Sequence, residues 1–192
     1  MDMRACRYML ILDIDGTVVE GSAREGVMEE QGLVVGPYGD PNRTYPYGKA
    51  AFLEAFNHPS MFHMDTTLPD AHTVVRLALA AGADIFYLTA RDVLHHEAIR
   101  HDLDRRGLWN ERMRLNCKPH VMWANTVDYK LWTLEHLCGL ARPGDAIYIE
   151  NHASIGKAAE ERVDQLTSYV TCSDAVHHLQ RWAKRCDTEG SR

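Results

Sequence analysis

The chain has 192 residues, 45% of them hydrophobic, and its 21 Lys and Arg against 27 Asp and Glu give a formal net charge of −6 at pH 7. This length and apolar content suit a single α/β core. The acidic balance does not favour a polynucleotide-binding surface, which is usually basic. No apolar run approaches the roughly 18 residues of a membrane span, so we expect no membrane partner.

Cysteine usage and the N-terminus indicate the compartment. The cysteines are odd in number, scattered and without a Cys-x-x-Cys pair: Cys6, Cys117, Cys138, Cys172 and Cys186. This pattern fits a reducing compartment and argues against a disulfide or zinc framework. The segment Met1–Arg7 is too short and polar to be a signal peptide. We therefore expect a cytoplasmic protein.

The first predicted strand, Tyr8–Leu12, leads into a pair of aspartates. Its five consecutive apolar residues are typical of a central parallel strand that is covered on both faces. Because strand side chains repeat every two residues, we expect Asp13 and Asp15 to leave on the same side, at the ligand-binding edge of the sheet. Two carboxylates brought together repel each other unless a cation or a shared proton relieves them. The pair therefore indicates a Mg²⁺ site, with one aspartate free to act as a nucleophile and the other as an acid/base.

The segment 18–65 is predicted to be an insert with little regular structure. Six glycines and three prolines lie between Gly21 and Gly48. The apolar stretch Leu33–Val35 is a candidate hairpin strand, and Phe52–Phe56 is a candidate short helix. Such an insert is too small for an independent cap domain, so we expect an open site. Three tyrosine rings either stack on a base or sugar or pack the loop onto the domain: Tyr38, Tyr45 and Tyr47.

Beyond the insert, strands and helices are predicted to alternate. The expected helices are about Pro69–Ala81, about Asp92–Arg106, one that begins near Lys130, about Ser154–Arg162 and one that includes Ala175–Ala183. The expected strands are one that ends at Leu88, a short one near Met113–Leu115, Ala146–Ile149 and Leu166–Val170. Alternation of this kind implies a parallel sheet with helices on both faces. We therefore predict an α/β, Rossmann-like three-layer sandwich that forms one domain over residues 1–192, with a small flap or cap insert after the first strand.

Polar side chains follow two other predicted strands and open one predicted helix. Thr89 and Arg91 come directly after an apolar strand, and an arginine fork suits bidentate contacts to phosphate oxygens. Thr89 could instead cap the following helix. Lys130 lies at the start of an amphipathic stretch. It is the leading candidate for a lysine in the site, and Lys118 and Lys157 are the alternatives.

The strand that ends at Ile149 is followed by Glu150 and Asn151. Both side chains offer oxygen ligands of the kind that Mg²⁺ prefers, although the pair carries one negative charge, whereas two adjacent acidic residues would carry two.

These motifs, in this order, resemble the haloacid dehalogenase (HAD) phosphohydrolase superfamily. Its first motif reads Asp-x-Asp-Gly-Thr, its second is a Thr or Ser at a strand end, its third is a lysine and its fourth is an acidic pair, for which this chain has Glu150-Asn151. The resemblance implies an aspartyl-phosphate phosphatase in which Asp13 is the nucleophile and Asp15 the acid/base. It further implies catalytic roles for Thr89 and Lys130, and one set of residues each for the substrate and the metal. Substrate would be bound by Thr17, Thr89, Arg91 and Lys130, and Mg²⁺ by Asp13, Asp15, Glu150 and Asn151.

The substrate is less sharply indicated than the reaction. The short insert and the Thr-Ala-Arg second motif resemble the 3′-phosphatase domain of phage-type polynucleotide kinase-phosphatases, which implies a nucleotide or a polynucleotide 3′-phosphate. The negative charge opposes nucleic acid, unless a local cluster overrides it: Arg105, Arg106, Arg112, Arg114 and Lys118. A nucleotide or another phosphorylated small molecule fits the acidic balance equally well. The alternative function is a pseudophosphatase that keeps the fold for binding, with metal binding weakened at Glu150 and Asn151.

Overall fold

The structure is a computed structural model that describes residues 7–37, 40–119 and 125–189. The expectations for Met1–Arg7 as a segment, for Cys6 and for Tyr38 fall outside these ranges. Within them, no helix combines the length and the apolarity needed to cross a membrane.

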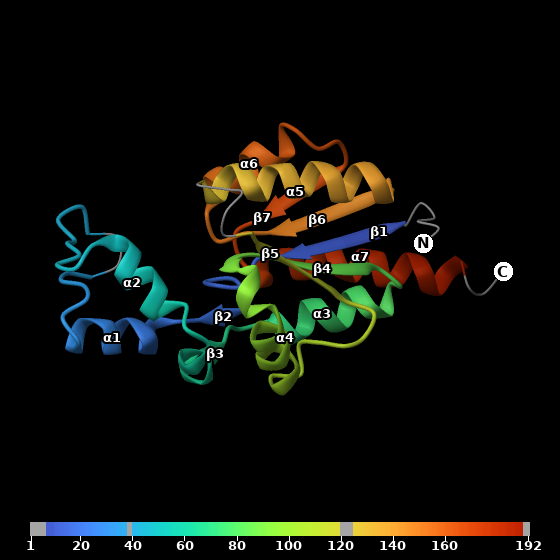
Figure 1. The fold of residues 1–192 in the computed structure, drawn as a ribbon. Coiled ribbons are helices and arrows are strands. Elements are labelled where there is room, and N and C mark those ends of the chain that lie inside the picture. Colours follow the sequence, from blue (N-terminus) through green and yellow to red (C-terminus); the bar gives the residue numbers. More distant parts are fainter. Residues whose placement is uncertain (1–6, 38–39, 120–124, 190–192) are drawn as a thin grey trace.

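A five-stranded parallel sheet forms the centre of the molecule (Figure 1), in the order β5-β4-β1-β6-β7. Its strands are β1 (Tyr8–Leu12), β4 (Asp84–Asp92), β5 (Arg114–Lys118), β6 (Asp145–Ile149) and β7 (Leu166–Tyr169). The register places Leu12 of β1 beside Tyr87 of β4 and Ile149 of β6. The residues that follow these three positions therefore emerge together at the carboxyl edge of the sheet.

Helices cover both faces of the sheet and confirm the three-layer prediction. One face carries α3 (Ala71–Ala80), α4 (His96–Arg105) and α7 (Cys172–Glu189), and the other carries α5 (Thr126–Ala141) and α6 (Ala153–Glu160). The apolar run of β1 serves both layers, because Leu10 and Leu12 belong to the first core and Met9 and Ile11 to the second. The helix predicted from Asp92 begins later, after the 3₁₀ turn η2 (Val93–His95).

The insert is more ordered than its glycines and prolines predict. It comprises β2 (Val19–Glu20), α1 (Ser22–Glu30), α2 (Lys49–Phe56), η1 (Pro59–Met64) and β3 (Thr66–Thr67), and it projects to the left in Figure 1. Helix α1 was not expected; it is stabilised by a small separate core of Met28, Val34 and Phe52, so tertiary packing outweighs local propensity. The short helix near Phe52 is confirmed. The prediction of a hairpin strand at Leu33–Val35 is wrong, because within the described ranges this segment forms an isolated bridge, from Val35 to Thr44, and no strand.

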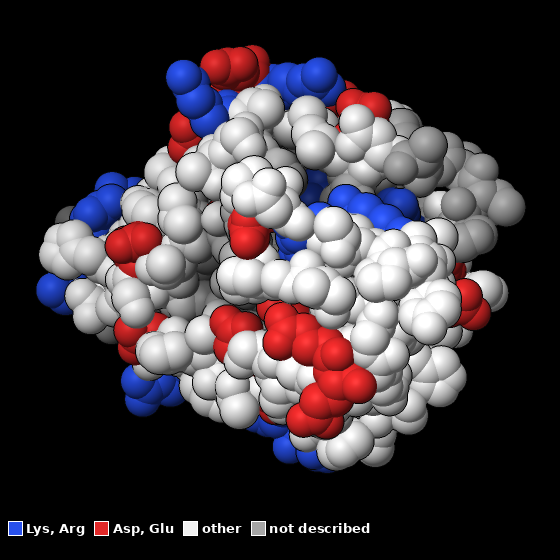
Figure 2. All heavy atoms as spheres, turned by 90° about the vertical axis from the view of Figure 1, so that its left-hand side faces the viewer, with Lys and Arg blue, Asp and Glu red and all other residues white. Residues whose placement is uncertain are grey.

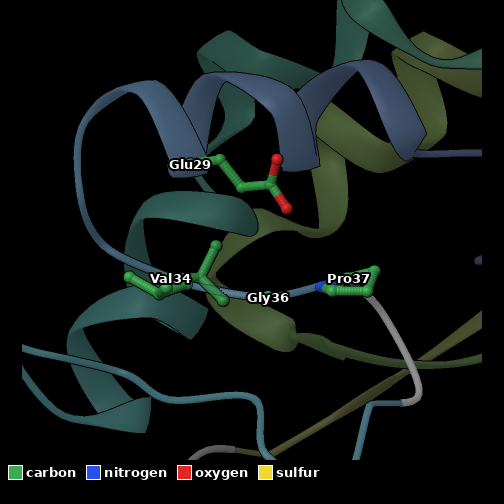
Figure 3. A pocket seen from close by; sticks show the side chains of 5 residues that line it. Glu29, Val34, Gly36 and Pro37 are labelled. Carbon is green, nitrogen blue, oxygen red and sulfur yellow. The ribbon is translucent and has the colours of Figure 1, made fainter.

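A pocket of about 450 Å³ lies within the insert, between α1 and the loop that follows it. It is lined by Glu29, Val34, Val35, Gly36 and Pro37, and Figure 3 shows the Glu29 side chain reaching from α1 toward this loop. None of the predicted site residues lines it.

Candidate functional site

Four of the predicted site residues converge at the carboxyl edge of the sheet, as the strand pattern predicts. Asp13 follows β1, Glu150 follows β6, Thr89 lies near the end of β4, and Lys130 reaches them from α5. The backbone N–H of Asp13 donates to the carbonyl of Ile149 at 2.9 Å, which extends the β1–β6 pairing into the site.

Lys130 bridges two buried carboxylates. Its Nζ donates to Asp13 Oδ1 at 2.8 Å and to Glu150 Oε2 at 2.6 Å, and the exposed fractions of the three side chains are 3%, 5% and 0%. Burial raises the pKa of Asp13 to about 7, although Lys130 opposes the rise. Burial alone would lower the pKa of Lys130, but the two carboxylates outweigh it and the pKa is raised. Lys130, rather than Lys118 or Lys157, therefore contacts the first aspartate.

Glu150, which is expected to be a metal ligand, accepts hydrogen bonds at both of its carboxylate oxygens. Its Oε2 accepts from Lys130 and from the Tyr148 hydroxyl, at 2.6 and 2.5 Å, and its Oε1 accepts from the His152 N–H at 3.2 Å. The longer glutamate side chain is therefore turned to the lysine and to its own strand. Three donors therefore surround this carboxylate, two at Oε2 and one at Oε1.

Asn151 is the member of the fourth motif that fits a cation. Its Oδ1 is buried and has no hydrogen-bond partner within the described ranges, and its Nδ2 lies 2.2 Å from where a Cβ on Gly16 would stand. Gly16 also has a φ of +75°, so a glycine suits this position in both respects. The Asn151 N–H donates to Thr17 Oγ1 at 3.2 Å, which connects the first motif to the fourth.

The expected metal ligands include few acidic side chains that lie together. Among the described residues, no group of three His, Cys, Asp or Glu side chains is placed to hold a metal ion. Asp13 and Asn151 therefore carry the metal-binding expectation, together with a backbone carbonyl. A buried amide oxygen without a hydrogen-bond partner is compatible with a hard cation such as Mg²⁺.

Asp15 is held by two arginines. Arg91 donates to both of its oxygens, at 2.9 Å from Nε and 2.7 Å from Nη2, and Arg24 Nη2 donates to Oδ1 at 2.7 Å. The Asp15 side chain is still 36% exposed. Burial alone would raise the pKa of Asp15, but Arg91 and Arg24 hold it well below its ordinary range. Arg91, which was expected to meet the substrate phosphate, thus faces Asp15 in this structure.

Arg24, Asp65 and Arg106 complete this part of the site; the sequence analysis missed Arg24 and Asp65 and gave Arg106 only as part of the basic cluster. Asp65 is fully buried between the two arginines, with its Oδ1 2.5 Å from Arg24 Nε and its Oδ2 3.1 Å from Arg91 Nη2. Arg106 of α4 donates to the backbone carbonyls of Asp65 and Phe62, both at 2.8 Å. No local motif marks their contacts with one another, because Arg24 and Arg106 both lie far from Asp65 in the sequence.

The remaining predicted residues have contacts within the protein. The Arg91 N–H donates to Thr89 Oγ1 at 3.1 Å, and this leaves the Thr89 hydroxyl hydrogen able to donate to a substrate oxygen. Tyr45 packs on Phe52 in the insert core, whereas the exposed fraction of Tyr47 is 72%.

Three arginines of the cluster beyond the second motif have partners within the protein. Arg105 and Arg106 pair with Asp102 at 2.6 and 2.9 Å, and Arg114 donates to nearby backbone carbonyls. Arg105, Arg106 and Arg114 therefore form contacts within the protein itself.

Comparisons with known proteins match the fold. No family model matches the sequence, and no curated protein resembles it closely enough to count as a relative. A structure from Burkholderia xenovorans LB400, described as a haloacid dehalogenase-like hydrolase, aligns at a TM-score of 0.57 with 16% identity, over 92% of this chain and 98% of that one. A hydrolase from Streptococcus pneumoniae TIGR4 aligns at 0.56 with 11% identity, over 91% and 98% of the two chains.

A third structure, a HAD-superfamily hydrolase from Ehrlichia chaffeensis, aligns at a TM-score of 0.54 with 8% identity, over 91% of this chain and 96% of that one. At such low identities the likeness is one of fold. Nearly the whole length of each chain is nevertheless covered, and the sheet that it covers places the carboxylates, threonine and lysine at one edge. The chain therefore has the fold of the HAD-superfamily hydrolases.

Proposed function

We propose that this protein is a Mg²⁺-dependent phosphomonoester hydrolase that works through an aspartyl-phosphate on Asp13. One observation carries the proposal: Asp13 lies at the carboxyl edge of the central strand with the ammonium of Lys130 2.8 Å away. This arrangement supplies a carboxylate nucleophile and a fixed positive charge for the transferring phosphoryl group. Solved structures of the same fold are hydrolases, which supports the assignment.

The reaction divides into two displacements at phosphorus. In the first, a carboxylate oxygen of Asp13 forms a bond to phosphorus while the bond to the leaving oxygen breaks, and Asp15 gives that oxygen a proton. In the second, Asp15 takes a proton from water, the water oxygen bonds to phosphorus and the bond to Asp13 breaks. Lys130 and Thr89 donate to the phosphoryl oxygens in both steps.

Asp15 must be protonated for the first step, yet its two arginines favour the ionised form. A bound phosphoryl group is a second anion that competes with Asp15 for Arg91. Drawing Arg91 toward the phosphate would remove the bidentate contact of 2.9 and 2.7 Å and raise the pKa of Asp15 toward its ordinary value. Substrate binding would thereby remove one of the two arginines that keep Asp15 ionised, and it would give Arg91 the phosphate contact that the resemblance implies.

Mg²⁺ fits the oxygens that remain available. Asp13, the Asn151 side chain and the backbone carbonyl of Asp15 would hold it. Once bound, the ion would offset the negative charge between the nucleophile and the phosphate. Because Glu150 is committed to Lys130, we expect weaker Mg²⁺ binding than a site with two acidic residues would give.

The proposed substrate is a nucleotide or a polynucleotide 3′-phosphate. Figure 2 views the molecule from the side of the insert, toward which β1 and β6 point in Figure 1. Acidic side chains gather in one area of this face, and Lys and Arg atoms lie in a recess near its centre. A recess with basic atoms suits a phosphate group, whereas the acidic surroundings favour a short ligand over a long polyanion.

Phosphate release in Mg²⁺ tests the proposal. The substrates are an aryl phosphate, mononucleotides and a 3′-phosphorylated oligonucleotide, and the variants are Asp13→Asn and the control Asp164→Asn, whose side chain is exposed. We expect Asp13→Asn to abolish turnover and Asp164→Asn to preserve it. The preferred substrate then distinguishes a small ligand from a polynucleotide. A folded wild-type protein without turnover on any of them would refute the enzymatic proposal and favour the binding module.

A further inference from the structure

Tyr148 is a buried tyrosine next to the site, and the proposed chemistry does not use its hydroxyl. It lies on β6 two residues before Glu150, and its exposed fraction is 0%. Side chains two residues apart along a strand share a face, so the sequence itself aims Tyr148 and Glu150 toward α5, which carries Lys130.

The contacts form a chain that ends at the nucleophile. The Tyr148 hydroxyl donates to Glu150 Oε2 at 2.5 Å, the same oxygen accepts from Lys130 Nζ at 2.6 Å, and Nζ also donates to Asp13 Oδ1 at 2.8 Å. An ammonium has three donors, so one remains for a phosphoryl oxygen. The direction of this third N–H bond is fixed by the directions of the first two N–H bonds, to Glu150 and Asp13.

Burial alone does not explain the partner of Tyr148. A buried tyrosine usually finds some hydrogen-bond partner, and Tyr87 on the neighbouring β4 finds an ordinary one, the backbone carbonyl of Leu108. Tyr148 instead donates to the carboxylate that holds the lysine. Burial and Glu150 raise the pKa of Tyr148 well above its ordinary value, so its hydroxyl stays a donor.

A glutamate in this position needs such a restraint. It has one more rotatable bond than an aspartate, so one more side-chain torsion must be fixed to hold its carboxylate at Lys130. The His152 N–H fixes Oε1 and the Tyr148 hydroxyl fixes Oε2. Without the hydroxyl, one of the two restraints on the carboxylate is lost.

We propose that Tyr148 is a positioning residue for the reaction, which acts through Glu150 to aim the ammonium of Lys130 at the transferring phosphoryl group. This inference rests on the proposed phosphatase function. It treats Glu150 as part of the machinery that orients the lysine, and Asn151 as the side chain of the fourth motif that serves the cation.

Steady-state kinetics with an aryl phosphate test the proposal on Tyr148→Phe and on the matched control Tyr87→Phe, which also removes one buried hydroxyl. We expect kcat of Tyr148→Phe to fall about tenfold, while KM and the half-activating Mg²⁺ concentration stay within about twofold of the wild type. Tyr87→Phe should lower the melting temperature to a similar degree and leave kcat within about twofold. Equal kcat values for the two variants, or a fall in Mg²⁺ affinity with Tyr148→Phe, would overturn the proposal.

A double variant tests whether Tyr148 acts through Glu150. Glu150→Gln should lower kcat, and the addition of Tyr148→Phe should cause no further fall, because residues that act through one another are not additive. Independent, multiplicative losses would refute the connection.

A readout without turnover separates this inference from the proposed function. Nuclear magnetic resonance of the lysine ammonium groups, with Lys130→Met to assign the signal, should show a slowly exchanging ammonium that Tyr148→Phe shifts and Tyr87→Phe leaves in place. If the wild type has no phosphatase activity, the proposed function fails while this signal still reports on the positioning of Lys130. An ammonium signal unaffected by Tyr148→Phe would refute the positioning role in either case.

Discussion

Replacing Lys130 by methionine should destabilise the protein and do so most strongly at alkaline pH. The ammonium lies 2.8 Å from one carboxylate oxygen and 2.6 Å from another, and none of the three side chains is more than 5% exposed. Methionine has a similar length but no charge, so Asp13 and Glu150 are left as neighbouring buried anions. Removing one partner of a buried ion pair typically costs about 3–5 kcal/mol.

For a chain of this size, each kcal/mol lowers the melting temperature by about 2–4 °C, so the expected fall is about 6–20 °C. The sign of the pH dependence follows from Asp13, whose pKa is already raised in the folded protein and rises further without the lysine. A carboxyl group whose pKa is higher when folded binds more protons in the folded state, so stability falls as the pH rises through that interval. The difference from the wild type should therefore be larger at about pH 8 than at about pH 5.

Thermal unfolding followed by circular dichroism, in the presence of a chelator, provides the measurement. Lys157→Met is the control because Lys157 lies exposed on α6. A Lys130→Met protein that melts with the control at alkaline pH, or whose deficit grows toward acid pH, would show that the ammonium does not neutralise these carboxylates.

Three further predictions concern the metal and the acid/base. Asn151→Asp should lower the half-activating Mg²⁺ concentration by about tenfold, because ligand charge tunes affinity; an unchanged titration would contradict the assignment of this side chain. The affinity for Mg²⁺ measured by calorimetry should rise with pH through about 7, since protons and the cation compete for Asp13, and a flat profile would argue against Asp13 as a ligand. Arg24→Ala removes one of the charges that lower the pKa of Asp15, so the pH–rate profile should shift to higher pH for that group, whereas Arg76→Ala should leave the profile in place.

The sequence predicted the sheet and the residues at its edge because both depend on short local patterns. An apolar run followed by Asp13 defines β1, the same pattern holds for Glu150 after β6, and Thr89 lies near the end of β4. The amphipathic pattern around Lys130 predicts its helix, whereas the expectation that Lys130 lies at this edge came from the resemblance to the HAD superfamily. Parallel pairing then brings these strand ends together whatever the insert does.

The parts that were missed depend on packing between distant segments. Arg24 reaches Asp15 from a helix that local glycine content argued against, and Asp65 joins them from the far end of the insert. The orientation of Glu150 was also out of reach, since it is set by Lys130 and Tyr148 rather than by the motif that contains it. Burial and pairing of this kind are properties of the assembled fold.

The contact between Arg24 and Asp15 connects the insert to the main sheet at the candidate site, and each of these two parts has its own apolar core. Arg24 belongs to the insert, which has its own apolar centre around Met28 and Phe52, whereas Asp15 follows the central strand of the main sheet. Loosening the insert alone would release Asp15 from one of its arginines while Asp13 and Lys130 keep their places. If the proposed function holds, the pH optimum should therefore shift under mild denaturant before the sheet unfolds, and this shift would report how firmly the insert packs.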